Sequence, residues 1–235
     1  CGGKFQIIGT AQDHKRAFNF ETGPNTGGMG CSIPPLIVSR EVEKQARKII
    51  QQALEGLEKE GRPYYGILYL GAMVVDKKVY VIEFNARWGD PEVQVILPGI
   101  KNDLFEMSMA VASKDISKIK VSTDGKSRVV IAGASKGYPG DYSEVKGKQI
   151  FGLDKINDVG VYGAGMKIIN GKYIVNGGRL FYIVGAGNSV IEARKKAYDS
   201  ISQIFIEGNN LHYRTDIGWR DAARFYSQKR VKKLL

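Results

Sequence analysis

The sequence has few of the features that mark several large classes of protein. No run approaches the ~18–20 apolar residues of a membrane span, and no basic segment followed by an apolar one stands near its start, as a signal peptide needs. Only two cysteines, Cys1 and Cys31, and two histidines, His14 and His212, occur. This composition gives no support to a disulfide scaffold, a Cys/His zinc site or a nucleophile triad, and it predicts a reducing, cytoplasmic compartment without membrane contact.

Positive charge is the main bias of the chain, with a formal net charge of +11 and a pI near 9.5. Such a surplus suits either nucleic acid or phosphorylated small molecules as partners. The basic residues are spread along the sequence, however, and the densest runs, Arg194–Lys196 and Lys229–Lys233, are short. We therefore expect a solvated basic surface, and we do not expect nucleic-acid binding.

The first half of the chain reads as a loop, a helix, a hairpin and a second helix. Residues 13–30 are rich in glycine and asparagine and predict a loop. Apolar residues at 3–4 residue spacing predict a helix that begins after Ser39 and ends at Gly61. Residues 66–76 and 78–86 are rich in β-branched and aromatic residues, which predicts an antiparallel hairpin. A further helix is expected over residues 104–112.

The second half reads as a small α+β unit. Residues 127–135 predict a buried strand, and residues 161–187 predict three short strands broken at two Asn-Gly positions. Ser189 and Glu192 form a capping box for a helix that reaches about residue 205. Charge rises between residues 113 and 126. We therefore predict an α+β fold of two parts, residues 1–117 and residues 118–235 with a basic tail.

Polar residues follow one another at the end of an apolar strand in "VIEFNARWGDPE" (residues 81–92), and the apolar Val81, Ile82 and Phe84 of this strand are expected to lie in a core. Alternation along a strand places Glu83 and Asn85 on one face, about 7 Å apart, where two oxygen ligands suit a hard cation such as Mg²⁺. If the strand stays regular, Arg87 continues that face and can hold a carboxylate or phosphoryl group with its guanidinium. The alternative is a solvent-facing strand edge with one Glu–Arg ion pair.

A second candidate site is the loop that contains Asp13, Lys15 and Arg16 and ends in "GPNTGGMG" (residues 23–30). Glycines let a backbone approach an anion closely, and their N–H groups can bind phosphate oxygens. The loop lacks the lysine and Ser/Thr of the nucleotide-binding phosphate loop. The alternative is an ordinary mobile surface loop in which His14 is structural.

Six segments in the same order resemble the phosphoribosylamine–glycine ligase family of ATP-grasp enzymes. They are "AQDHKRAFNFETGPNTGGMG", "GILYLGAMVV", "VIEFNARWGDPEVQVILP", "GYPGDY", "VNGGRLFYIVGAG" and "RTDIGW". The resemblance runs over nearly the whole chain. It implies an antiparallel ATP-grasp sheet with helices, followed by a small C-terminal domain.

The resemblance also implies a reaction. ATP phosphorylates the carboxylate of glycine, and the amine of 5-phosphoribosylamine attacks the glycyl phosphate to give glycinamide ribonucleotide, ADP and phosphate. Glu83 and Asn85 match the family's ligands for Mg²⁺ or Mn²⁺, and Arg87 is expected to steady the phosphoryl group. The positions expected beside the glycine and phosphoribosylamine sites are Asp13, Lys15, Thr26 and Gly27.

Two departures from the family pattern bear on these expectations. Lys136 stands where the family has a glycine, within a turn. The family's first half, with its glycine-rich domain and lysine-bearing lid, has no counterpart, so we expect the chain to be a C-terminal half that is inactive without its N-terminal partner. Another ATP-grasp ligase or carboxylase, and a non-catalytic module derived from the ligase, are the alternatives.

Overall fold

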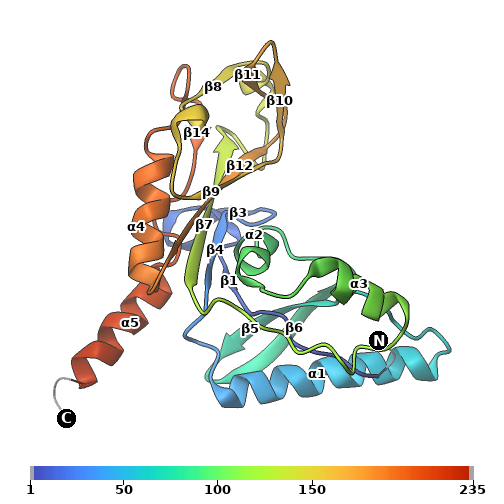
Figure 1. Cartoon of the computed structure of the whole chain (residues 1–235). Coiled ribbons are helices and arrows are strands. Elements are labelled where there is room, and N and C mark those ends of the chain that lie inside the picture. Colours follow the sequence, from blue (N-terminus) through green and yellow to red (C-terminus); the bar gives the residue numbers. More distant parts are fainter. Residues whose placement is uncertain (1–2, 233–235) are drawn as a thin grey trace. The chain divides into compact units, whose positions relative to one another are not determined.

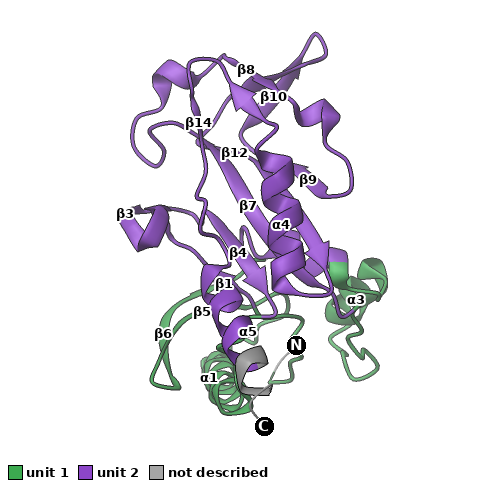
Figure 2. Cartoon of the chain, turned by 90° about the vertical axis from the view of Figure 1, so that its left-hand side faces the viewer, with its two compact units in different colours: residues 1–10, 35–89, 99–124 green, residues 11–34, 90–98, 125–235 purple. Residues whose placement is uncertain are grey.

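The structure, a computed structural model that describes residues 3–232, divides into two compact units (Figure 2). Unit 1 comprises residues 1–10, 35–89 and 99–124, and unit 2 comprises residues 11–34, 90–98 and 125–235. Each unit is therefore assembled from stretches that are far apart in the sequence. The predicted division between residues 117 and 118 concerns consecutive segments of sequence and stays a prediction.

Unit 1 is built on helix α1 (Arg40–Lys59) and the antiparallel pair β5 (Tyr69–Val75) and β6 (Lys78–Asn85) (Figure 1). The Ser39 hydroxyl accepts a hydrogen bond from the backbone N–H of Val42 at 3.3 Å and so begins α1 as predicted. The Gln45 side chain ties α1 to the hairpin through hydrogen bonds to Lys77 and Val79. Helix α3 (Leu104–Ala112) also forms where it was predicted.

The hairpin exposes apolar side chains that were expected to lie in a core. Val81 is 47% exposed, Ile82 63% and Phe84 39%. Gly71 pairs with Glu83 and Ala72 with Val81, so Ile82 is an extra residue in a β-bulge. The expectation was wrong for a physical reason: a two-stranded sheet has two faces, and among the described elements of unit 1 the main contact of β6 outside the hairpin is with α1.

Unit 2 contains a six-stranded antiparallel sheet in the order β1-β4-β7-β12-β9, with β14 also paired to β7 (Figure 1). Its strands are β1 (Gln12–Asp13), β4 (Gly30–Ile33), β7 (Ser127–Ser135), β9 (Gly160–Gly163), β12 (Arg179–Gly187) and β14 (Leu211–His212). Residues from both ends of the chain thus flank the central strand β7. Every strand pairing among the described residues is antiparallel, in keeping with the predicted α+β class.

A second sheet, of four strands, has the order β10-β11-β8-β13, and β2 pairs with β3. The strands are β2 (Arg16–Phe18), β3 (Thr22–Asn25), β8 (Gln149–Phe151), β10 (Met166–Ile169), β11 (Lys172–Val175) and β13 (Phe205–Ile206). The helices of unit 2 are α2 (Val93–Ile96), α4 (Val190–Ile201) and α5 (Trp219–Lys232).

The core of unit 2 lies where α4 packs on β7 and β12 (Figure 1). Val129 to Ala132 of β7 are fully buried, as the continuous apolar run predicted. The Ser189 hydroxyl accepts from the Glu192 N–H at 3.3 Å, and the Glu192 carboxylate accepts from the N–H of Asn188. The predicted start of α4 is therefore confirmed, although the helix ends at Ile201 and not near residue 205.

Several sequence predictions for unit 2 need correction. Residues 13–30 are not a simple loop, because they contain strands that pair with each other and with β7. Residues 160–187 form four strands and not three, since β9 joins the six-stranded sheet and β10 the other. The start of the basic run Lys229–Lys233 lies in α5, while Lys233 and Cys1 lie outside the described residues. Among the described residues, no helix is both long and apolar enough to cross a membrane.

Candidate active site

The predicted metal pair lies at the end of β6 in unit 1. Asn85 pairs with Tyr69 and Glu83 with Gly71 across the hairpin, and the bulge at Ile82 lies before both. Alternation is therefore preserved between Glu83 and Asn85, so their side chains share one face of the strand. Glu83 is exposed and Asn85 is half-buried. Both side chains are thus placed as the sequence predicted.

The chemistry of this pair fits a divalent cation that is shared with a bound phosphate. No group of three or more His, Cys, Asp or Glu residues suited to a metal occurs within residues 3–232. Mg²⁺ needs no such group, because it keeps several waters and takes other ligands from phosphates. Within the described structure the Asn85 amide nitrogen is buried and has no hydrogen-bond partner. It could donate to a phosphate oxygen while the amide oxygen faced the cation.

The prediction for Arg87 assumed that the strand stays regular through this residue. Arg87 does not continue the strand. β6 ends at Asn85, and residues 86–87 form a bend. The exposed Arg87 guanidinium donates one hydrogen bond to the carbonyl of Trp88 at 2.9 Å. A guanidinium carries five N–H donors, so this contact leaves donors with which Arg87 can bind an anion.

Asp13 and Lys15 form a charged pair in unit 2. The Lys15 ammonium lies 3.3 Å from one Asp13 oxygen, and the other oxygen accepts from the His14 N–H at 2.8 Å. The Asp13 side chain is only 13% exposed. Burial, followed by the nearby negative charge of Glu92, raises the pKa of Asp13 to about 7. The pair therefore combines a half-exposed cation with a carboxyl that is costly to ionise.

Thr26 and Gly27 use their polar groups inside the protein. The Thr26 hydroxyl donates to the Lys15 carbonyl at 2.8 Å and accepts from the Gly28 N–H at 2.9 Å. The Gly27 N–H donates to the hydroxyl of Tyr138 at 3.0 Å. These amides are engaged within the protein and do not form an open cradle for phosphate. Whether Thr26 and Gly27 also contact substrate stays a prediction.

A buried polar cluster holds the start of the same segment to the "RTDIGW" motif. Arg214 is fully buried and binds Asp216 through two hydrogen bonds of 2.8 Å. It also donates to Glu21 at 2.7 Å and to the carbonyl of Arg16 at 3.0 Å. Burial alone would raise the pKa of Glu21, but hydrogen bonds from His14 and Arg214 outweigh it and lower that pKa to about 2.

His14 is structural, as the alternative interpretation of the loop proposed. Its ring is fully buried, and burial lowers its pKa. The Nε2 atom accepts from the Gly218 N–H at 3.1 Å, so Nδ1 carries the proton and donates to Glu21 at 2.9 Å.

Ser135, which has glycines two residues before and after it, is buried in β7 and donates to the Gly177 carbonyl. The segment is therefore not the exposed turn of a serine nucleophile.

Sequence reasoning missed the residues that hold the loop in place. Arg179 donates to Gly27, Gly28 and Asp90, and Tyr138 accepts from Gly27. Both belong to segments, "GYPGDY" and "VNGGRLFYIVGAG", that were noted for their resemblance and given no function. No spacing rule connects positions 27, 138 and 179, because the contacts exist only in the folded unit.

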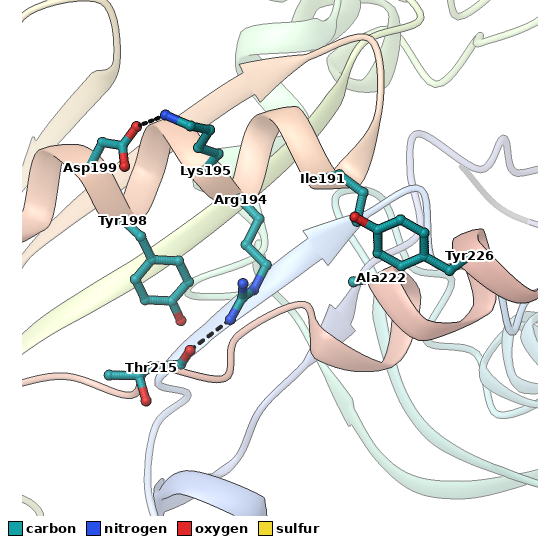
Figure 3. Close-up of a pocket in the computed structure, with 8 residues that line it drawn as sticks. All are labelled: Ile191, Arg194, Lys195, Tyr198, Asp199, Thr215, Ala222 and Tyr226. Atoms are coloured by element: carbon teal, nitrogen blue, oxygen red, sulfur yellow. Dashed lines mark hydrogen bonds and ion pairs between the residues drawn. The ribbon is translucent and has the colours of Figure 1, made fainter.

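A cavity of about 450 Å³ lies between α4 and α5, away from these residues (Figure 3). Arg194 points toward Thr215 in this view and donates to its carbonyl at 2.7 Å and to the carbonyl of Ile217 at 3.0 Å. Its guanidinium also packs over the ring of Tyr198. None of the predicted site residues lines the cavity. Its polar groups support the "RTDIGW" turn and do not form the candidate active site.

The class of the chain follows from two matches to the domains of an ATP-grasp synthetase. Residues 1–93 match the family described as phosphoribosylglycinamide synthetase, ATP-grasp (A) domain, and residues 128–220 match the C domain of the same synthetase. The two matches occur in order and cover most of the chain. The chain therefore belongs to the phosphoribosylglycinamide synthetase family.

Individual relatives agree with this assignment. The chain is 42% identical over 209 residues to a phosphoribosylamine–glycine ligase of Caldanaerobacter subterraneus, covering 88% of this chain and 49% of that one. It is 41% identical to a trifunctional purine biosynthetic protein adenosine-3 of Gallus gallus, and the match covers 94% of this chain and 22% of that protein. The crystal structure of a phosphoribosylamine–glycine ligase from Thermotoga maritima matches with a TM-score of 0.81 and 35% identity, covering 92% and 53%. The chain thus spans about half the length of such a ligase.

Proposed function

We propose that this chain contributes to the ATP-dependent ligation of glycine to 5-phosphoribosylamine. A glycine carboxylate oxygen would attack the γ-phosphorus of ATP and release ADP. The amine nitrogen of phosphoribosylamine would then attack the carbonyl carbon of glycyl phosphate, expelling phosphate and losing a proton, to give glycinamide ribonucleotide. The observation that carries this proposal is the ordered match to both domains of one synthetase.

Glu83 and Asn85 are proposed to hold Mg²⁺ or Mn²⁺. A cation held there would supply positive charge that offsets the negative charge developing during phosphoryl transfer. Glu83 would supply a negatively charged ligand and Asn85 a neutral one. Arg87 is proposed to steady the migrating phosphoryl group, and the exposure of its guanidinium supports this role. Together they would provide the positioning and charge neutralisation on which phosphoryl transfer depends.

The substrate-binding role belongs chiefly to Asp13 and Lys15. Glycine is a zwitterion: Lys15 offers a positive group to its carboxylate, and Asp13, with a pKa of about 7, offers a negative group to its ammonium in the ionised form. The Lys15 side chain is 49% exposed, so it can reach a carboxylate or phosphate without losing its place in the segment. Thr26 and Gly27 would shape the backbone that carries Lys15. A cytoplasmic location, where ATP is at hand, is part of the same proposal.

The remaining half of the ligase is the proposed protein partner. On unit 1 the hairpin exposes Met73 and Tyr80, which face each other across β5 and β6, and the extra residue Ile82. Phe105 on α3 is 72% exposed. Several exposed apolar side chains on one unit are typical of a surface that another protein segment covers. We propose that the part of the ligase outside the matched half binds here and provides the rest of the nucleotide site.

The proposal is tested in a chimaeric ligase in which this chain replaces the matching half of the Caldanaerobacter enzyme. ADP release that depends on both glycine and phosphoribosylamine is the expected result, and the chain alone serves as the baseline. ADP release with bicarbonate in place of glycine would favour a carboxylase. A chimaera that binds no ATP in a titration would favour a non-catalytic module.

Glu83→Ala in the chimaera tests the metal site. Loss of the charged ligand should lower turnover at limiting Mg²⁺ by at least about 100-fold, because the charge of the metal acts directly on the transferred group. Glu58→Ala, which removes an exposed carboxylate from α1, is the matched control and should leave turnover unchanged. Equal turnover of the Glu83 variant and the unchanged chimaera at limiting Mg²⁺ would refute the assignment.

A further inference from the structure

Arg179, the first residue of β12, joins two segments that carry the candidate active site. Its Nη1 atom lies 2.9 Å from the Gly27 carbonyl, 3.1 Å from the Gly28 carbonyl and 3.0 Å from the Asp90 carbonyl. Its Nη2 atom donates to the Asp90 carboxylate at 2.8 Å. The side chain is only 16% exposed, so these charge-assisted contacts are shielded from water. One side chain therefore holds both the glycine-rich segment and the turn at Asp90.

The local sequence is adapted to this contact. A Cβ atom on Gly27 would lie 2.8 Å from the Arg179 guanidinium, and one on Gly28 would lie 2.5 Å from Cδ of Pro91. Gly28 also has a φ of +113°, which side chains rarely adopt. The glycine pair thus allows the backbone to approach Arg179 and Pro91 and does not leave space for an anion. Tyr138 completes the contact by accepting from the Gly27 N–H.

Each end of this link leads to a predicted site residue. Thr26, next to Gly27, bonds the Lys15 carbonyl through both its N–H and its hydroxyl at 2.8 Å. A displacement of the glycine pair would therefore move Lys15. The other end, at Asp90, follows Arg87 by three residues along the chain.

We propose that Arg179 is a positioning residue for the ligase reaction, which sets the glycine-rich segment and the turn at Asp90 in the arrangement that substrates require. This inference rests on the proposed function. Arg179 itself need not contact substrate, since Nη1 and one N–H of Nη2 already bind the two segments. A lysine at this position keeps the charge but has one nitrogen in place of a planar fork, so it cannot keep both the Nη1 contacts with the three carbonyls and the Nη2 bond to the Asp90 carboxylate.

The test compares Arg179→Lys with Arg128→Lys. Arg128 is a buried arginine on β7 that donates to the Pro98 carbonyl, so the control removes a guanidinium from the same sheet. In the chain alone, amide hydrogen exchange is measured at Gly27 and Gly28 and, for comparison, in α4. Arg179→Lys should speed exchange at both glycines by at least about tenfold and leave α4 unchanged, because only the local opening becomes easier.

The second readout is steady-state kinetics of the chimaeric ligase. Arg179→Lys should lower kcat/KM for glycine and for phosphoribosylamine by about 10- to 100-fold, because small misplacements far from the chemistry have effects of this size. The KM for ATP should stay within about twofold, and Arg128→Lys should change none of these values. A general loss of stability would not lower kcat/KM for glycine and phosphoribosylamine while leaving the KM for ATP unchanged.

Three results would overturn the inference. Exchange at Gly27 and Gly28 could be unchanged, exchange could rise equally in α4, or it could rise at the glycines while kcat/KM for both substrates stayed the same. An inactive chimaera made from the unchanged chain would instead contradict the proposed function. The exchange comparison would then still show whether Arg179 holds the two segments.

Discussion

Replacement of Asp13 by Asn should stabilise unit 2 at neutral pH and impair ligation. The folded pKa of Asp13 is about 7, against an ordinary value of 3.8. Each pKa unit corresponds to about 1.4 kcal/mol, so the ionised carboxylate costs the folded state about 4 kcal/mol. The cause is burial, with the negative charge of Glu92 adding to it. Asn keeps the oxygen that accepts from His14 but carries no charge.

The sign of the pH dependence follows from linkage. Between pH values of about 4 and 7 the unfolded chain loses the Asp13 proton while the folded chain keeps it, so stability falls as pH rises. Above the folded pKa the loss is complete. Asp13→Asn should therefore match the unchanged chain near pH 4 and exceed it by about 4 kcal/mol at pH 8. The attraction of the half-exposed Lys15 is already contained in this figure, because Lys15 lowers the pKa of Asp13 against the effect of burial.

Urea-induced unfolding at a series of pH values measures this difference. The matched control is Asp199→Asn, which removes an exposed carboxylate from α4, and its effect should stay within about 0.5 kcal/mol at every pH. In the chimaeric ligase Asp13→Asn should lower kcat/KM for glycine, because a costly buried charge is retained where function needs it. A stability difference that is the same at pH 4 and pH 8, or an Asn variant that is less stable at both, would refute the reasoning.

The remaining predictions concern the folding of unit 2 and are also measured by urea unfolding. Arg214→Ala should destabilise it by about 3–5 kcal/mol, because Asp216 and Glu21 lose their buried partner. The control is Arg220→Ala. Arg220 lies 3.4 Å from Glu21 and is partly exposed, so its loss should cost at most about 1 kcal/mol. Equal effects would contradict the role given to burial. Gly28→Ala should cost about 2–5 kcal/mol through its positive φ and the clash with Pro91, whereas Gly147→Ala, with positive φ but open space, should cost about 1–2 kcal/mol. Matching costs would show that Pro91 moves away freely.

Local patterns predicted the elements whose contacts are close in sequence. α1 begins at Ser39, α4 begins after the Ser189 cap, and the β5–β6 hairpin forms with the expected pairing. Apolar spacing and caps act over a few residues, so their signal is visible without the fold. The two-residue alternation of side chains along a strand placed Glu83 and Asn85 on one face.

The failures share a different cause. Residues 13–30 were interpreted as a loop because glycine, proline and asparagine are typical of turns and loops. The structure instead pairs β4 with β7, almost a hundred residues further along the chain. Likewise, Ile82 was expected inside a core because it is apolar. Its exposure reflects how few elements cover the hairpin in unit 1, which composition cannot report.

The sequence by itself determined the family, the shared strand face of Glu83 and Asn85, and the choice of Asp13 and Lys15 as candidate residues, because these depend on residue types in a fixed order. Only the tertiary structure decided what holds them. The glycines at 27 and 28 proved to be places of close approach for Arg179 and Pro91, and Arg214 proved to be the buried partner of Glu21. Such contacts join residues more than 60 positions apart, and no local pattern encodes them, because they arise when the strands of unit 2 pair.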